Sequence, residues 1–148
     1  MRHAPSKRTR RAAAAQPQKN SGTPREAALA IRVDFGPYGF LGPGKIALME
    51  LVAKRGSISA AGKTMGMSYR RAWLLIDEIN RIFRTPLVEK QMGGSGGGGA
   101  RLTALGRDVV SRYRAIEAAA AGASAADLKA LKASLPTRPA AAPPGEDV

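Results

Sequence analysis

Six of the seven residues at positions 93–99 are glycine, and this run lies between segments with regular apolar patterns. Glycine loses more conformational freedom on folding than any other residue, so such a run disfavours the interior of a helix or strand. The flanking stretches, "LVEKQ" and "ARL", are short and read as extended segments. We therefore predict that the run is the tip of a β-hairpin, where the backbone turns sharply and approaches another surface without side chains in the way.

Three helices are predicted before this hairpin, because apolar residues recur there at helical spacing between capping signals. Proline suits a first helical turn, serine caps an N-terminus, and glycine or X-Pro ends a helix. These signals give helices that begin at Pro43, at Ser57 or Ser59, and at Ser68, and that end at Gly56, at Gly66 and at Thr85-Pro86. The apolar pattern of the third helix runs to Phe83. Ahead of them, alternation in "AIRVDF" predicts a short strand, and "GPYGFLGPG" is predicted to be a loop.

A long helix is predicted after the hairpin, in "TALGRDVVSRYRAIEAAAA". One stripe of this helix, about four turns long, carries Leu105, Val109, Tyr113, Ile116 and Ala120. A hairpin is too short to cover such a stripe, so we expect an uncovered interaction surface, most simply for a second copy of the chain. The alternative is that the stripe packs entirely on the first helix of its own chain.

This order of elements describes a winged helix-turn-helix, a mainly α fold with a small β-hairpin and a long C-terminal dimerisation helix. Ala60-Ala61 are expected to pack where the second and third helices cross, and Gly66 turns the chain between them. We expect residues 29–121 to form this DNA-binding domain. Residues 1–28 are predicted to be a disordered basic arm, and residues 122–148 an Ala/Pro-rich, disordered tail with at most a short helix around 125–135.

The charge of the chain points to an anionic partner. Its formal net charge is +13, from 24 Lys and Arg against 11 Asp and Glu, and the first 28 residues alone carry seven basic residues and one acidic residue. Such a balance favours nucleic acid or an acidic membrane surface. No apolar run approaches the ~18 residues that a spanning helix needs, and the alanines after Arg10-Arg11 are too few for a signal sequence. We expect no membrane partner and a cytoplasmic location.

The exposed residues at the start of a recognition helix are those that reach base edges and phosphates. Here they are Ser68, Tyr69, Arg70 and Arg71. An arginine can bind a guanine edge with two hydrogen bonds, and a serine at a helix N-terminus suits a phosphate oxygen. The alternative for Arg70 and Arg71 is a solvated helix face, but their place after a Gly-x-Ser turn in a basic protein favours DNA. Trp73 is left outside this set, because a tryptophan also suits the core or an interface.

Other interpretations of the glycine run fit its context less well. It satisfies G-x-G-x-x-G, as any glycine run does, but a dinucleotide site also needs a βαβ unit around it. A P-loop would need Gly-Lys-Ser/Thr at its end, which is missing. A flexible linker is the remaining alternative, and the regular patterns that continue on both sides of the run disfavour it.

The stretch "GSISAAGKTMGMSYRRAWLLIDEINRIF", joined to "PLVEKQMGGSGGGGARLTALG", resembles the ModE family of molybdate-responsive transcriptional regulators, in their LysR-like winged-helix domain. The resemblance covers residues 31–118 and rests on Ser68-Tyr69, Ala72-Trp73, Asn80 and the glycine run. It implies a homodimer on operator DNA, with the recognition helix in the major groove and the wing against the backbone or minor groove. It also implies that the first and last helices contribute to the dimer.

Two departures from the family's pattern concern the wing and the sensor. Family wings often carry a lysine among the glycines where this chain has Ser95, so Lys90, Gln91 and Arg101 are expected to share the wing's DNA contacts with Ser95. Full-length members also carry a molybdate-binding region of barrel modules, whereas here only residues 122–148 follow the last helix. Direct molybdate binding is therefore not expected, and shorter regulators made of the DNA-binding domain alone resemble this chain more closely.

No catalytic residue, metal site or cofactor is predicted. The chain has no cysteine, its one histidine is His3, and the adjacent Asp77 and Glu78 diverge on a helix. We expect a non-enzymatic, bacterial, sequence-specific transcriptional regulator that binds double-stranded DNA as a homodimer. Two alternatives stay open: an architectural or accessory protein that binds DNA mainly through charge, and a helix-turn-helix used for protein contact.

Overall fold

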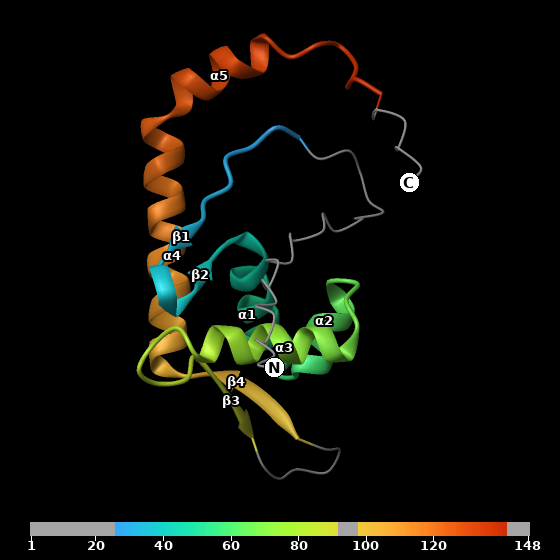
Figure 1. The fold of residues 1–148 in the computed structure, drawn as a ribbon, viewed down its shortest axis with the longest axis vertical. Coiled ribbons are helices and arrows are strands. Elements are labelled where there is room, and N and C mark those ends of the chain that lie inside the picture. Colours follow the sequence, from blue (N-terminus) through green and yellow to red (C-terminus); the bar gives the residue numbers. More distant parts are fainter. Residues whose placement is uncertain (1–25, 92–97, 142–148) are drawn as a thin grey trace, which may run out of the picture.

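The computed structural model describes residues 26–91 and 98–141 of the chain. Within these residues, five α-helices and two antiparallel strand pairs follow one another as a winged helix-turn-helix (Figure 1). The elements are β1 (Val33–Asp34), a 3₁₀ turn η1 (Gly36–Tyr38), β2 (Phe40–Leu41), α1 (Pro43–Arg55), α2 (Ile58–Thr64), α3 (Tyr69–Asn80), β3 (Val88–Gln91), β4 (Gly99–Leu102), α4 (Ala104–Ala123) and α5 (Ala125–Ala133). The predicted mainly α, winged helix-turn-helix class is confirmed, and the dimerisation role of the last long helix stays a prediction.

Parts of the expectations lie outside the described residues. They are residues 1–25 of the arm, residues 142–148 of the tail, and residues 92–97, which include Ser95 and most of the glycine run. The predicted domain limits at 28 and 121 stay predictions. The helix α5 occupies the stretch in which the sequence suggested a short helix.

The sequence suggested that the segment between β1 and α1 is all loop, but part of it forms a strand. Phe40 and Leu41 form a strand that pairs with β1 in the register Val33↔Leu41 and Asp34↔Phe40. Gly36, at φ 63°, and Gly39, at φ 118°, turn the chain back, in conformations that favour glycine. Leu41 enters the core from this strand. A strand of two residues is too short to leave a periodic signal in the sequence, which explains the wrong prediction.

The predicted ends of α1 and α2 and the predicted start of α3 are found, whereas α3 does not run on to Thr85-Pro86. Gly56 ends α1 in the left-handed region at φ 70°, and its N–H donates to Val52 O. Ser57, not Ser59, caps α2, where Oγ accepts from Ala60 N at 3.1 Å. Ser68 caps α3, where Oγ accepts from Arg71 N at 3.2 Å. Gly66, at φ 70°, makes the turn between the two helices, so the helix-turn-helix is fixed by local signals.

The helix α3 ends at Asn80, three residues before the end of its predicted apolar pattern. Ile82 and Phe83 continue the pattern in the turn that follows, because both still pack against the core. The ring of Phe83 meets that of Phe35 edge-on, with centroids 5.4 Å apart. Because these two residues of the turn are also at least partly buried, the apolar pattern in the sequence continues past the end of the helix.

The helices α2 and α3 come close together at Gly62, the residue after the predicted contact residues Ala60-Ala61. A Cβ on Gly62 would lie 2.6 Å from the Cβ of Ala72, which is far too close. Ala61 is buried beside this point, whereas Ala60 is only partly buried. Glycine in α2 therefore permits the close approach of α3, and of the two predicted residues Ala61 lies in the core beside it.

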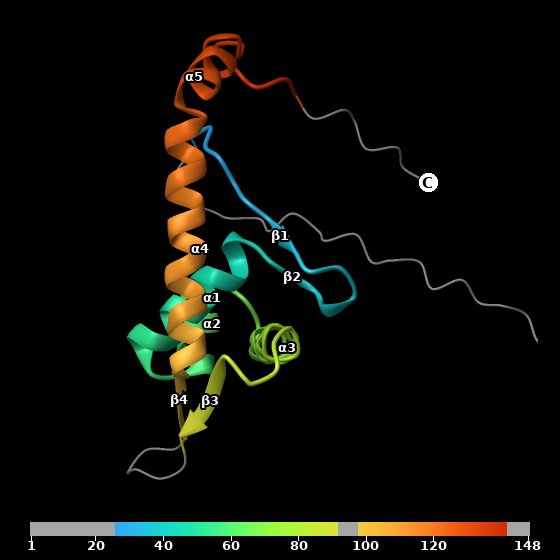
Figure 2. The same ribbon diagram turned by 90° about the vertical axis from the view of Figure 1, so that its left-hand side faces the viewer.

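The long helix α4 covers one side of the molecule, and the segment before β1 runs beside it (Figure 2). Val109 and Tyr113 are buried within their own chain, and the hydroxyl of Tyr113 donates to Ile31 O at 2.7 Å. The expectation of a wholly uncovered stripe is therefore wrong for this half of α4. Further along, Ile116 stays 48% exposed, so the stripe is covered only in part. Among the described residues, no helix has the length and apolarity to cross a membrane.

Candidate nucleic-acid interface

The first turn of α3 presents the residues expected to read DNA. Tyr69 is 65% exposed, and Arg70 and Arg71 are exposed beside it. Neither arginine makes an ion pair with a described carboxylate, so both guanidinium groups are available to an external acceptor. The rest of the helix is held by Ala72, Ile76 and Ile79 in the core, which fixes the orientation of the exposed face.

Ser68 contributes through the cap it forms. Its hydroxyl accepts the Arg71 N–H, and its carbonyl accepts the Ala72 N–H. The N–H groups of the first helical residues, Tyr69 and Arg70, have no acceptor within a helix at this position. Such N–H groups, with the positive end of the helix dipole, form an anion site suited to a phosphate oxygen.

The wing is the β3–β4 hairpin, and its register divides the predicted wing residues between two faces. The pairs are Val88↔Leu102, Glu89↔Arg101, Lys90↔Ala100 and Gln91↔Gly99. Side chains alternate along a strand, so Lys90 shares a face with the buried Val88, and Gln91 shares the other with Arg101. The wing residues are therefore not one continuous contact set.

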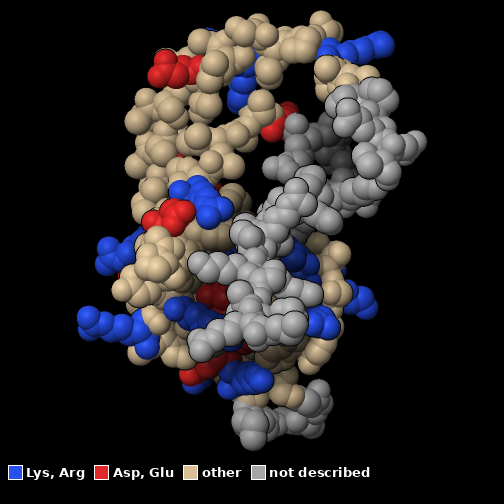
Figure 3. Space-filling model, in the orientation of Figure 1, with Lys and Arg blue, Asp and Glu red and all other residues tan. Residues whose placement is uncertain are grey.

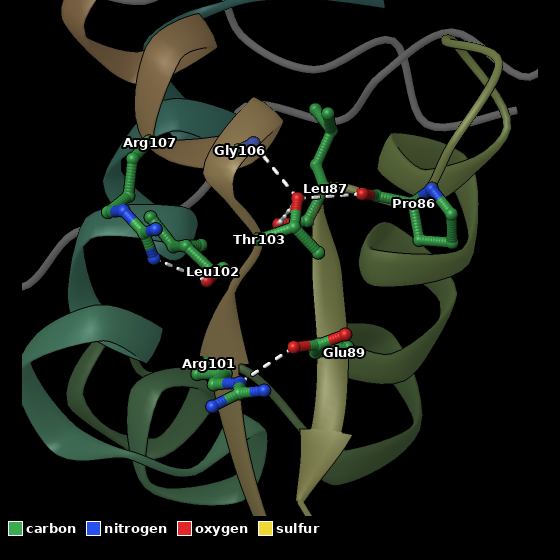
Figure 4. Close-up of polar contacts among 8 residues, drawn as sticks. All are labelled: Pro86, Leu87, Glu89, Arg101, Leu102, Thr103, Gly106 and Arg107. Carbon is green, nitrogen blue, oxygen red and sulfur yellow. Dashed lines mark hydrogen bonds and ion pairs between the residues drawn. The ribbon is translucent and has the colours of Figure 1, made fainter.

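Arg101 is engaged across the hairpin. Its Nε donates to Glu89 Oε1 at 2.6 Å, and the two side chains point toward each other from neighbouring strands (Figure 4). Both are well exposed, so the pair contributes little to stability. It does neutralise the charge that the sequence had suggested for phosphate contact. To contact a DNA phosphate, the Arg101 guanidinium would have to break its contact with Glu89 or bind both groups at once.

Lys90 faces the recognition helix. Its ammonium lies 4.3 Å from the centroid of the Trp73 ring. The Trp73 ring also lies 5.8 Å from that of Tyr69, one turn earlier in α3. Trp73 is partly buried and packs against the core, so it is not among the exposed residues expected to contact bases. The structure thus brings Lys90 to α3 and leaves Gln91 and Arg101 on the far face of the hairpin.

The base of the wing is fixed by a side chain that also begins α4. The hydroxyl of Thr103 donates to Pro86 O at 2.8 Å and accepts from Gly106 N at 3.0 Å (Figure 4). A Cβ on Gly106 would lie 2.1 Å from Leu87 O, so only glycine permits this approach of helix and strand. These contacts hold the hairpin close to the domain.

Some of the described cations are paired with carboxylates and others are not. The ion pairs of the described residues join Arg32–Asp34, Lys45–Glu78, Arg101–Glu89, Arg112–Asp108, Arg114–Glu50 and Arg114–Glu117. Lys63 of α2, missed by the sequence analysis, joins Arg70, Arg71 and Lys90 as a described cation without a carboxylate partner, and only its charge could have indicated it. In Figure 3 the basic side chains lie mostly in the lower half of the view, which holds α1–α3 and the hairpin. On the face in this view, most basic side chains therefore lie around the helix-turn-helix.

This region of the chain is similar to known bacterial proteins. Residues 44–107 match the family model described as bacterial regulatory helix-turn-helix protein, lysR family. The chain is 40% identical over 91 residues to the molybdenum transport protein ModE of Azotobacter vinelandii, a match that covers 62% of this chain and 33% of that protein.

Two other relatives give the same result. The chain is 43% identical over 74 residues to the DNA-binding transcriptional dual regulator ModE of Escherichia coli (strain K12), covering 50% of this chain and 28% of that protein. It is 40% identical over 81 residues to the molybdenum-pterin-binding protein MopB of Rhodobacter capsulatus, covering 55% and 30%. The chain thus spans about a third of the length of these curated relatives. The resemblance predicted from the sequence is confirmed over this region.

Proposed function

We propose that this chain, in which residues 44–107 form a helix-turn-helix domain of the LysR type, is a sequence-specific transcriptional regulator that binds double-stranded DNA as a homodimer. One observation carries the proposal. The capped first turn of α3 exposes two arginines that no described carboxylate neutralises. Such a turn has both the reach and the chemistry to meet base edges.

In this proposal α3 enters the major groove by its N-terminal end. Arg70 and Arg71 bind base edges, with guanine the preferred acceptor because its two acceptor atoms match a guanidinium. The N–H groups at the start of α3, with Ser68, bind a phosphate of the same groove. The wing contacts the neighbouring backbone through Lys90, with Gln91, Ser95 and Arg101 as further candidates. No chemistry on the DNA is involved, and such a protein is not an enzyme.

The homodimer would use the part of α4 that its own chain leaves uncovered. Ile116 is 48% exposed on the same stripe as the buried Val109 and Tyr113. An exposed isoleucine that continues a core stripe is suited to a second copy related by a two-fold axis. Two recognition helices about one DNA turn (~34 Å) apart would then read two half-sites, which gives a short helix useful specificity.

The names of the relatives mention molybdenum and molybdenum-pterin as well as DNA. The matched stretch is the helix-turn-helix domain, so we propose DNA binding alone for this chain and keep the prediction that it does not bind molybdate directly. A regulator of this kind would act in the cytoplasm, where bacterial DNA lies.

The second candidate is an architectural protein that binds DNA through charge, which the net charge of +13 favours. The two functions differ in specificity. Genomic fragments selected by the protein would be compared with random DNA of the same length over a salt series. A sequence reader keeps an affinity ratio of at least ~10³, whereas charge-driven binding falls alike for both. A ratio near one at all salt concentrations would contradict the proposed function.

A further inference from the structure

A cluster of three side chains joins the recognition helix to the wing. Trp73 lies at its centre, with the Tyr69 ring 5.8 Å away and the Lys90 ammonium 4.3 Å from its centroid. Lys90 makes no ion pair with a described residue. The contact that the described residues make with its ammonium is therefore the indole ring. We call this set the Tyr69–Trp73–Lys90 cluster.

The buried indole N–H of Trp73 indicates that this side chain has a role besides packing in the core. Nε1 is buried and has no hydrogen-bond partner among the described residues. A buried donor without a partner is unfavourable, and phenylalanine or leucine would fill much of the same space without one. The face of tryptophan, however, attracts a cation more strongly than that of phenylalanine or tyrosine. A contact with Lys90 explains why a tryptophan occupies this position. Packing in the core alone does not explain it.

The wing gains from a contact beyond its base. The strands β3 and β4 form a two-stranded sheet, and β4 is attached to the end of α1, because the N–H of Ala100, the partner of Lys90, donates to Gly56 O at 2.8 Å. Asn80 and Thr103 fix the base of the hairpin, through Val88, Leu87 and Pro86. Lys90 lies two residues further toward the tip on β3, so its contact with Trp73 attaches this strand to α3 where Ala100 already attaches β4 to α1.

We propose that Trp73 is a positioning residue, whose ring holds the Lys90 ammonium beside α3 so that Lys90 meets a DNA phosphate at the edge of the groove that α3 enters. This role rests on the proposed function, because it describes how the wing takes part in DNA binding. The lysine ammonium has three N–H donors, and a ring on one side leaves donors free for a phosphate. Trp73 itself acts through Lys90 and does not contact DNA.

The contact is tested first in the full chain without DNA. Trp73 is the sole tryptophan, so its emission and its indole N–H resonance report on the cluster alone. Lys90→Met should shift that resonance and change the emission, whereas Lys90→Arg, which keeps a cation over the ring, should preserve most of the signal. Lys129→Met, in α5, removes the same charge elsewhere and should leave both signals unchanged. An unshifted resonance in Lys90→Met would overturn the contact.

The role is tested by a double-mutant cycle on the selected DNA. Lys90→Met should weaken binding by about three- to tenfold and lower the slope of log affinity against log salt by ~0.9, the value for one phosphate contact. Trp73→Leu should cause a similar loss, and Lys90→Met should then cost less than about twofold more, because the two residues act as one unit. Trp73→Phe, which keeps a ring in the core, should lose less, and it serves for the cycle if Trp73→Leu does not fold.

The outcomes separate this role from the proposed function. Losses that multiply in the double variant would overturn the positioning role and leave DNA binding standing. A parent chain that binds no DNA would overturn both. Thermal unfolding of each variant, monitored by circular dichroism, distinguishes a loss of binding from a loss of fold.

Discussion

Asn80, the last residue of α3, holds Val88, the first residue of β3, through two hydrogen bonds. Its Oδ1 accepts from Val88 N at 3.0 Å, and its Nδ2 donates to Val88 O at 3.0 Å. The same oxygen accepts from Leu87 N at 3.0 Å. One side chain thus joins the recognition helix to the wing, so the geometry between these two elements is set inside the domain.

Replacing Asn80 should therefore destabilise the domain. In Asn80→Ala, the N–H groups of the buried Leu87 and Val88 lose their acceptor, and we expect the free energy of unfolding to fall by about 2–4 kcal/mol. Urea denaturation measures this change. Asp77→Ala, an exposed change on the same helix, should alter it by less than about 0.5 kcal/mol and serves as control. Equal stability of the two variants would contradict the role of Asn80.

Tyr113 should make stability depend on alkaline pH. Burial raises the pKa of the Tyr113 hydroxyl, Glu117 raises it further, and Arg114 opposes them. Because the pKa is higher in the folded state than the usual value of about 10, the stabilisation is complete below about pH 10 and is lost as pH rises through the folded-state pKa. Tyr113→Phe should lower the free energy of unfolding by about 0.5–1.5 kcal/mol at neutral pH, since it removes the bond to Ile31 O.

The difference between parent and Tyr113→Phe should then shrink above about pH 10, as the parent alone loses this contribution. Urea denaturation at several pH values from neutral upward measures it. Tyr38→Phe changes a tyrosine that is 69% exposed and should leave the profile of the parent unchanged. A difference that stays constant with pH would exclude a stabilising role for the neutral Tyr113 hydroxyl.

Ile116 should support the homodimer. Ile116→Asp places a charge on the uncovered part of the α4 stripe and should raise the dimer dissociation constant by at least about tenfold. Ala118→Asp adds the same charge on roughly the opposite side of the helix and should remain a dimer. Sedimentation of the three proteins at micromolar concentration distinguishes them. A parent that already sediments as a monomer would contradict the proposed assembly.

The first 28 residues should add affinity without specificity. They carry a net charge of +6, from seven basic residues and one acidic residue. The hydrogen bond that ties this end of the chain to α4 starts later, at Ile31, so deletion of residues 1–28 should leave the melting temperature nearly unchanged. Affinity should fall for every DNA sequence, and the salt slope should decrease by ~0.9 for each phosphate that the arm no longer binds. An unfolded truncation, or an unchanged salt slope, would argue against an electrostatic arm.

Local signals in the sequence predicted the helix-turn-helix well, because they act within a few residues. Gly56, Ser57, Gly66 and Ser68 each end or cap a helix through a contact to a near neighbour in the chain. The exposed first turn of α3 followed directly from the cap at Ser68. The candidate interface on α3 was therefore accessible from the sequence alone.

Features that depend on register or on distant contacts were not predictable. The strand register across the glycine run must be known to predict the Glu89–Arg101 pair. The same holds for the placement of Lys90 and Gln91 on opposite faces. The hydroxyl of the buried Tyr113 bonds to Ile31 O, 82 residues earlier in the chain. These features follow from how the elements pack against one another, which no local pattern records.

The central claim is that the first turn of α3 reads DNA bases. It is tested most directly by the affinities of the parent, Arg70→Ala and Arg71→Ala for the selected site and for its single-base variants. Each alanine variant should lose discrimination at particular base pairs, by ~1–3 kcal/mol for each bidentate contact removed. Arg112→Ala, which removes an arginine paired with Asp108 on α4, should keep the discrimination of the parent. A uniform loss of affinity across all sites for both Arg70→Ala and Arg71→Ala would contradict the claim and reduce these residues to phosphate contacts.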